Sequence, residues 1–275
     1  MKKGINAWSF GKMKISEILS LAKKAGFEGV ELNLGEEGEL SLESSREEIE
    51  EIANLAKGLN LELPSLSTGL HWKYSLSSLD LRLREKGMEI VERMLEDAAI
   101  LGADTILVVP GLVTEEADYD YVYKASQESL NNLVPLASEC KVCIGIENVW
   151  NKFLLSPLEF KRFIDEVSSP YLAAYFDLGN VLIFGYPEQW IEILGKRIKK
   201  VHIKDFITKI GNISGFTNLL EGDINWRKVI LALKKINYQS YLTAELTPYS
   251  LYPEKLIYDT SSSMDLILER SKENA

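Results

Sequence analysis

The chain has few of the residues that build disulfide frameworks or histidine-rich metal sites. Its 275 residues include two cysteines, Cys140 and Cys143, and two histidines, His71 and His202. Two cysteines cannot form the disulfide network of a small secreted domain, and a structural zinc site would need two more ligands. We therefore expect the cysteines to be packing residues. Two imidazoles also exclude a multi-metal site built mainly from histidine.

Positive charge and long apolar runs are scarce as well. The chain has 31 lysines and arginines against 41 acidic residues, which gives a formal charge of −10. This balance argues against nucleic-acid or anionic-membrane partners, because both require clustered positive charge. No apolar run approaches the roughly 18 residues of a membrane span, and the N-terminus lacks a signal-peptide pattern. We expect a cytoplasmic protein.

The sequence does contain a regular alternation of short β-rich runs and amphipathic helical stretches. The β-rich runs are 4–8, 29–33, 61–65, 104–109, 142–147, 172–176, 200–203 and 241–245. The helical stretches are 15–25, 46–57, 82–101, 121–138, 157–167, 188–194, 226–236 and 254–270. Each β-rich run is thus followed by a helix, which is the connection that parallel strands need.

This alternation predicts an α/β fold, a (β/α)₈ TIM barrel that forms a single domain over residues 1–275. Eight such units match the size of that barrel, and no linker-like segment divides the chain. The alternative is a doubly wound open sheet. Its usual glycine-rich turn after the first strand is absent, because Trp-Ser-Phe-Gly occupies positions 8–11.

Polar residues at the ends of the last four predicted strands indicate a metal site. Glu147 ends the fifth run, Asp177 follows the sixth, His202 lies in the seventh and Glu245 ends the eighth. The carboxyl ends of barrel strands meet at one rim, where active sites lie. Three carboxylates and an imidazole suit one divalent cation, with Mn²⁺ expected first and Mg²⁺, Co²⁺ or Zn²⁺ as alternatives. The competing interpretation is four separate rim salt bridges.

The sequence around these four residues resembles a known family. The motifs are Glu-Asn at 147–148, Phe-Asp-Leu-Gly-Asn at 176–180, His-Ile-Lys-Asp at 202–205 and Ala-Glu-Leu at 244–246. They resemble the sugar phosphate isomerase/epimerase family of xylose isomerase-like TIM barrels, and the resemblance covers nearly the whole chain. That family includes D-tagatose 3-epimerase, the L-ribulose- and xylulose-5-phosphate 3-epimerases, hydroxypyruvate isomerase and inosose dehydratase.

The resemblance implies a sugar or sugar-phosphate epimerase or isomerase, with a ketose 3-epimerase favoured. It implies that the four residues bind one divalent metal and that Glu147 and Glu245 exchange a proton with the substrate. It also implies a homo-oligomer, either a dimer or a tetramer. The fifth and eighth strands lie about 135° apart around an eight-stranded barrel. The two glutamates would therefore approach a central ligand from different sides, as epimerisation through an ene-diolate requires.

Three positions depart from the free-sugar epimerases of this family. Asn180 replaces a histidine, Thr208 replaces an arginine and Phe153 replaces a glutamate. The Asp-Leu-Gly-Asn motif at 177–180 and the His-Ile-Lys-Asp motif at 202–205 resemble the sugar-phosphate and uncharacterised branches more closely. The substrate, and whether it carries a phosphate, stays open at this point.

The candidate substrate-binding residues are His71, Asn180 and Lys204. The long segment 204–225 contains three glycines and is typical of a binding loop or lid. Barrel phosphate sites often use loops after strands seven and eight, so Lys204 and Lys209 are phosphate candidates. The alternative for Lys204 is an ion pair with Asp205 or another acid at the rim.

Tryptophans near the predicted rim have two interpretations. Trp8, at the end of the first predicted strand, and Trp150, after the fifth, could provide apolar faces for a sugar ring, and the pair His71-Trp72 after the third strand could contact the substrate. The alternative is plain packing for Trp8 and Trp150, and a surface loop for His71 and Trp72.

Three other functional classes remain in view. An inosose dehydratase-like lyase and a non-catalytic sugar-binding barrel both fit the same framework. An endonuclease IV-like hydrolase fits poorly, because its three-zinc site requires several histidines and this chain has two.

Overall fold

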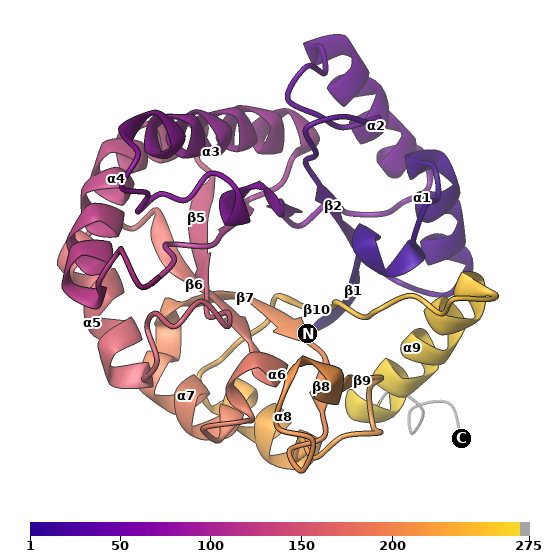
Figure 1. Ribbon diagram of the computed structural model, residues 1–275. Helices are drawn as coiled ribbons and strands as arrows, with labels where there is room; N and C mark the ends of the chain where they lie inside the picture. The colour runs from indigo at the N-terminus through magenta and orange to yellow at the C-terminus, as the bar shows by residue number, and fades with distance from the viewer. Residues whose placement is uncertain (270–275) are drawn as a thin grey trace.

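Eight parallel strands close into a barrel with helices arranged around it (Figure 1). The computed structural model describes residues 1–269. The barrel strands are β1 (Lys2–Asn6), β2 (Gly29–Asn33), β3 (Leu66–Ser67), β4 (Thr105–Val108), β5 (Cys143–Glu147), β6 (Leu172–Asp177), β7 (Ile198–Ile203) and β10 (Tyr241–Ala244). They are hydrogen-bonded in the order β1-β10-β7-β6-β5-β4-β3-β2. The predicted TIM barrel is confirmed.

The helices cover the outside of the barrel. They are α1 (Ile15–Lys24), α2 (Arg46–Gly58), α3 (Leu81–Leu101), α4 (Tyr119–Cys140), α5 (Pro157–Val167), α6 (Leu178–Val181), α7 (Pro187–Leu194), α8 (Trp226–Lys235) and α9 (Pro253–Ile267). Short 3₁₀ turns are η1 (Ala7–Phe10), η2 (Leu70–Trp72), η3 (Gly195–Arg197) and η4 (Ile213–Gly215). Among residues 1–269, none of the helices is both long and apolar enough to cross a bilayer.

Local sequence signals explain where the helices begin. At α5 the Ser156 hydroxyl accepts a hydrogen bond from the Glu159 amide, and Pro157 occupies the first helical position. At α2, Ser45 and Glu48 form a reciprocal capping box. These caps fix the helix starts that follow the carboxyl ends of the strands, and thereby the rim on which the site is built.

Several predicted boundaries differ from the structure. The third strand was expected at 61–65 but pairs at Leu66–Ser67, because Pro64 has no N–H to donate to a ladder. The first strand starts at Lys2, and Trp8 lies in η1 beyond it. The last helix was expected to reach Arg270, which lies outside the described residues, as does the rest of the predicted domain to residue 275.

The segment after β7 contains a hairpin instead of an irregular loop. Strands β8 (Asp205–Phe206) and β9 (Phe216–Thr217) pair antiparallel. The buried Asp205 carboxylate accepts hydrogen bonds from the Leu220 amide at 3.1 Å, the Ile224 amide at 3.2 Å and the Trp226 indole at 3.0 Å. A Cβ at Gly222 would lie 2.2 Å from Asp205 Oδ1, so this close approach requires glycine. One carboxylate thus fastens the far end of the segment to its start.

The cysteines are free thiols in the described part of the chain. Cys143 is buried on β5, and Cys140 is half-buried at the end of α4. Burial raises the pKa of the Cys143 thiol to about 12, which makes it unreactive at neutral pH.

Candidate metal centre and active site

Four side chains from the ends of β5, β6, β7 and β10 converge at the rim of the barrel. Glu147, Asp177, His202 and Glu245 each offer one donor atom, and these atoms all lie within 4.8 Å of one another. Donors bound to one cation at about 2.2 Å are at most about 4.4 Å apart, so small side-chain movements suffice to share an ion. The set predicted from the sequence is therefore brought together as one group.

Asparagine side chains hold the ends of β5 and β6 together. The Asn148 amide donates to the Asp177 carbonyl at 2.8 Å, and the Asp177 N–H donates to Asn148 Oδ1 at 2.9 Å. The Asn180 N–H donates to Asp177 Oδ1 at 2.8 Å, and its side-chain amide donates to the Asn148 carbonyl at 2.9 Å. Asp177 Oδ2 accepts no hydrogen bond and is buried. One carboxylate oxygen is thus fixed by the backbone, and the other is left for a cation, which in this structure is the Lys204 ammonium at 3.0 Å.

His202 is oriented by Glu31, a residue that the sequence interpretation missed. The His202 Nε2 atom lies 2.5 Å from Glu31 Oε1, and both side chains are fully buried. The other ring nitrogen, Nδ1, lies 3.3 Å from Glu147 and 3.8 Å from Glu245. Histidines that bind metals commonly donate their second N–H to a carboxylate. Nδ1 is accordingly the nitrogen that faces the cation position.

Glu31 is itself fixed by three neutral donors inside the barrel: the Asn6 amide at 2.6 Å, the Ser65 hydroxyl at 2.7 Å and the Tyr175 hydroxyl at 2.5 Å. Burial would raise the pKa of Glu31, but the positive charge on His202 and these hydrogen bonds lower it below its ordinary value. The carboxylate therefore stays ionised and accepts hydrogen bonds from every side.

The two glutamates expected to be catalytic have different acidities. Burial raises the pKa of Glu147 to about 7, despite its contact with His202. Burial acts on Glu245 as well, but the charges of Lys204 and His202 outweigh it and lower the pKa of Glu245 to about 2. Burial thus favours the protonated form of Glu147, whereas the charges of Lys204 and His202 favour the ionised form of Glu245. Such a pair is suited to proton donation by one member and proton removal by the other.

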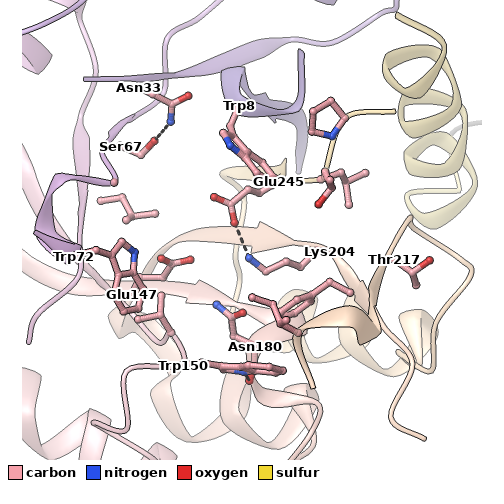
Figure 2. A pocket seen from close by; sticks show the side chains of 18 of the residues that line it. Trp8, Asn33, Ser67, Trp72, Glu147, Trp150, Asn180, Lys204, Thr217 and Glu245 are labelled. Carbon is pink, nitrogen blue, oxygen red and sulfur yellow. Dashed lines mark hydrogen bonds and ion pairs between the residues drawn. The ribbon is translucent and has the colours of Figure 1, made fainter. Parts of the chain in front are cut away.

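Lys204 lies among the carboxylates (Figure 2). Its Nζ atom is 2.6 Å from Glu245 Oε2 and 3.0 Å from Asp177 Oδ2. Burial lowers the pKa of Lys204, but the charges of Asp177 and Glu245 reverse this and raise the pKa well above its ordinary value. Pairing with rim acids was one of the two alternatives expected for this lysine.

A cavity of about 1030 Å³ lies at this rim, and two of the four residues, Glu147 and Glu245, line it. Its wall includes the rings of Trp8, Trp72, Trp150, Phe216 and Tyr249. Trp8 and Trp72 are about half exposed. The Trp150 indole donates to the Asn180 carbonyl at 2.8 Å, and its ring centroid lies 5.0 Å from that of Phe216. The hairpin after β7 thus provides one side of the cavity.

The other candidate substrate contacts are placed differently. Asn180 and Lys204 line the cavity, and they remain candidates for binding substrate. His71 is almost completely buried in η2, its ring nitrogens have no hydrogen-bond partner, and it is not among the residues that line the cavity. Burial lowers the pKa of His71 to about 4. Its neighbour Trp72 reaches the cavity instead, and substrate contact by His71 stays a prediction. Lys209 is exposed on the hairpin and does not line the cavity either.

Two positions that depart from the free-sugar epimerases have structural roles here. Phe153 is buried and packs edge-on against Tyr119 and Phe163, with centroid distances of 5.4 and 5.6 Å. Thr208 donates its hydroxyl to Asp223 at 2.5 Å, which ties the two ends of the hairpin segment. Neither side chain lines the cavity.

Comparison with known proteins agrees with this geometry. The profile of the xylose isomerase-like TIM barrel family matches residues 19–265. The chain belongs to this family. Among curated relatives, the L-ribulose-5-phosphate 3-epimerase UlaE of Escherichia coli is 27% identical over 235 residues, which is 81% of this chain and 78% of UlaE.

Solved structures of other proteins have the same fold. A D-psicose 3-epimerase crystallised in the presence of D-fructose has a TM-score of 0.83 at 21% identity, and the alignment covers 97% of this chain and 98% of that chain. The IolI protein, solved with a bound zinc atom, has a TM-score of 0.80 at 18% identity, with 98% and 99% coverage. The family resemblance expected from the four motifs is confirmed.

Proposed function

We propose that this chain is a divalent-metal-dependent epimerase that inverts the carbon next to the carbonyl of a ketose. The observation that carries the proposal is the convergence of Glu147 and Glu245 with Asp177 and His202 within 4.8 Å. The glutamates come from β5 and β10, which are three positions apart in the barrel. The name of UlaE supports a ketose 3-epimerase over other sugar chemistry.

The residues present fit a divalent cation. Three carboxylates and one imidazole are donors that Mn²⁺, Mg²⁺, Co²⁺ and Zn²⁺ accept, and we expect Mn²⁺ first. The buried Asp177 Oδ2 lies 3.0 Å from the Lys204 ammonium, and the Nδ1 atom of His202 lies 3.3 Å from Glu147. Both side chains belong to the group whose donor atoms lie within 4.8 Å of one another. When bound, the cation polarises the substrate carbonyl and stabilises negative charge on the neighbouring oxygens.

The two glutamates perform the proton transfers. In one direction the ionised Glu245 removes the proton from C3, and the electrons of that C–H bond form the double bond of an ene-diolate. Glu147 then donates a proton to the opposite face of C3, which restores the ketose with inverted configuration. Glu245 then carries the abstracted proton and Glu147 is ionised. Exchange of these protons with solvent restores the pair for another turnover, and in the reverse direction the roles of the two glutamates exchange.

The wall of the cavity protects this intermediate from water. Trp8, Trp72 and Trp150 present large rings to the space above the carboxylates (Figure 2). Excluding water strengthens the electrostatic interactions of the site and limits loss of the ene-diolate. Lys204, held by Glu245 and Asp177, is within reach of a substrate oxygen at the same place.

Deuterium incorporation tests the proposal. Protein loaded in turn with Mn²⁺, Mg²⁺, Co²⁺ or Zn²⁺ is incubated in D₂O with ketoses and their phosphates, then chelated, and the sugars are analysed by mass spectrometry and NMR. We expect one deuterium at C3 and formation of the C3 epimer. Loss of water from the sugar would instead identify a lyase, and neither reaction with any sugar would leave only a binding protein.

Glutamine variants connect the reaction to its residues. Glu147→Gln and Glu245→Gln keep the size of the side chain and one oxygen donor, and each should lower turnover at least ~10²-fold. The matched control is Glu139→Gln, an exposed carboxylate at the end of α4 on the opposite side of the barrel. Wild-type rates in both active-site variants would rule out the two-glutamate mechanism.

A further inference from the structure

We propose that the cavity binds an uncharged keto-sugar and discriminates against the corresponding sugar phosphate. The proposal rests on the epimerase function above and concerns which substrates that site accepts. The proposed substrate class differs from that of UlaE, whose name specifies a sugar phosphate. The proposal is based on the charges of the described residues around the cavity.

The cavity wall has little positive charge to offer a phosphate. Among its lining residues in the described part of the chain, Lys204 is the one with a cationic side chain. That ammonium already lies 2.6 Å from Glu245 and 3.0 Å from Asp177. A phosphate group carries about 1.5 to 2 negative charges at neutral pH and is usually met by charge-assisted hydrogen bonds. Lys204 is the cationic side chain available to meet it, and in this structure its ammonium is held by Glu245 and Asp177.

Negative charge around the cavity opposes a phosphate further. Glu147 and Glu245 both line it, and the whole chain has a formal charge of −10. A bound divalent cation and Lys204 together roughly balance the three carboxylates at the base of the site, so no excess positive charge remains for a second anion. The long-range field of the protein also repels anions during association.

The helix N-termini that often hold a phosphate in barrels have an acidic residue or a side-chain cap here. Such sites use the loops after the seventh and eighth strands and a helix N-terminus. The first turn of α8 is capped by Asn225, whose side chain accepts from the Lys228 amide. The first turn of α9 starts with Pro253, which has no N–H, and continues with Glu254. Lys209 does not line the cavity, and its positive charge contributes to lowering the pKa of Asp223.

What the wall does offer matches the hydroxyl groups and C–H faces of a neutral sugar. Its polar lining residues include Asn33, Ser67, Thr217, Asn218 and Thr247, all uncharged. Asn33 and Ser67 are hydrogen-bonded to each other at 2.5 Å across one side of the cavity (Figure 2). The indole rings of Trp8, Trp72 and Trp150 line the same cavity, and flat aromatic faces pack well against the apolar face of a sugar ring.

Matched substrate pairs test this inference. The Mg²⁺-loaded protein is given L-ribulose and L-ribulose 5-phosphate, and separately D-fructose and D-fructose 6-phosphate. Initial rates give kcat/KM, and quenching of tryptophan fluorescence gives apparent Kd. We expect kcat/KM to be at least ~10-fold higher, and Kd lower, for the uncharged member that serves as substrate. Equal values, a preference for the phosphate, or binding of neither member of either pair would overturn the inference.

The outcomes separate this inference from the proposed function. Deuterium exchange with a preference for the phosphate keeps the epimerase and removes the inference. Tighter binding of the uncharged sugars without any deuterium exchange keeps the inference about the substrate and removes the epimerase function.

Two variants examine the charge argument directly. Thr247→Arg adds a cation to an exposed part of the wall and should narrow the ratio of kcat/KM between sugar and phosphate. An unchanged ratio would mean that charge does not set the preference. Lys209→Ala is the matched control and should leave the ratio as it is. A selective loss with the phosphate would show that Lys209 binds it and would overturn the inference.

Discussion

Glu31 Oε1 lies 2.5 Å from the Nε2 atom of His202, and both side chains are shielded completely from solvent. This contact turns the Nδ1 atom of His202 toward Glu147 and Glu245. Glu31 cannot itself reach the cation position with the same oxygen. It therefore acts on a metal through the orientation and basicity of the imidazole.

Replacing Glu31 should weaken metal binding although it is not a ligand. We expect Glu31→Ala to lower the affinity for Mn²⁺ or Zn²⁺ about 10- to 100-fold, the usual range for a carboxylate behind a metal-binding histidine. Glu31→Gln should recover part of the loss, since its amide oxygen can still accept from Nε2. Calorimetric titration measures the affinity, and thermal unfolding shows that the variants are folded. Affinities equal to that of the control Glu62→Gln would contradict this role.

Metal affinity should fall as the pH is lowered through neutrality. The pKa of Glu147 is raised to about 7 by burial, so a proton occupies this ligand increasingly below pH 7 in the metal-free protein. A metal must displace that proton, and binding therefore releases protons. Titrations at pH 6, 7 and 8, in buffers with different ionisation enthalpies, measure both effects. A pH-independent affinity with no proton release would show that Glu147 is not a ligand.

Removing the charge of Lys204 should strengthen metal binding and weaken catalysis. The ammonium competes with a cation for the oxygens of Glu245 and Asp177. In Lys204→Met these carboxylates lose their partner, so a divalent ion should bind more tightly, while kcat falls because a group near the substrate oxygens is lost. Metal titration and steady-state kinetics measure the two effects, with Lys209→Met as control. Weaker metal binding in Lys204→Met would mean that the lysine supports the ion instead of competing with it.

His71 should make the fold sensitive to acid. Its pKa is lowered to about 4 by burial, against an ordinary value of 6.5. Between these values the unfolded chain binds more protons than the folded one, so stability decreases as the pH falls from 6.5 to 4. A shift of this size corresponds to about 3 kcal/mol. Denaturant unfolding should show a smaller loss over this range in His71→Phe, and an identical loss would assign the acid sensitivity to other groups.

The convergence of the four candidate ligands could be predicted from the sequence because it depends on strand ends alone. In a closed parallel barrel the carboxyl ends of all strands lie at the same rim. The four candidate ligands lie at the ends of strands that are consecutive in the barrel, so identifying the strands was enough to expect these side chains near one another: Glu147, Asp177, His202 and Glu245. Glu31 was missed because it lies within the second strand and its partner is 171 residues away. A charged residue inside the otherwise apolar run Gly-Val-Glu-Leu at 29–32 was the available signal, since such a residue is buried only with partners.

The contacts of Lys204 and His71 could not be decided from sequence patterns. The spacing of residues 202–205 places Lys204 at the rim, but whether its ammonium meets substrate or protein depends on side chains from β6 and β10. His71 and Trp72 are neighbours in a 3₁₀ turn, and a shift of one residue in that turn changes which side chain faces the cavity. In the structure Trp72 lines the cavity and His71 does not. Turn geometry of this kind has no periodic signal in the sequence.

The Asp205 carboxylate has a consequence for the thermodynamics of ligand binding. It fixes the residues at both ends of the hairpin segment, so one wall of the cavity is already ordered before a sugar arrives. Ordering a flexible segment costs about 1 to 2 kcal/mol of conformational free energy per residue. When the segment is already held in the folded protein, this cost is part of the free energy of folding and not of ligand binding. A sugar then needs to immobilise few protein groups beyond itself. Its affinity should depend on contacts at the site and little on the conformational entropy of the loop.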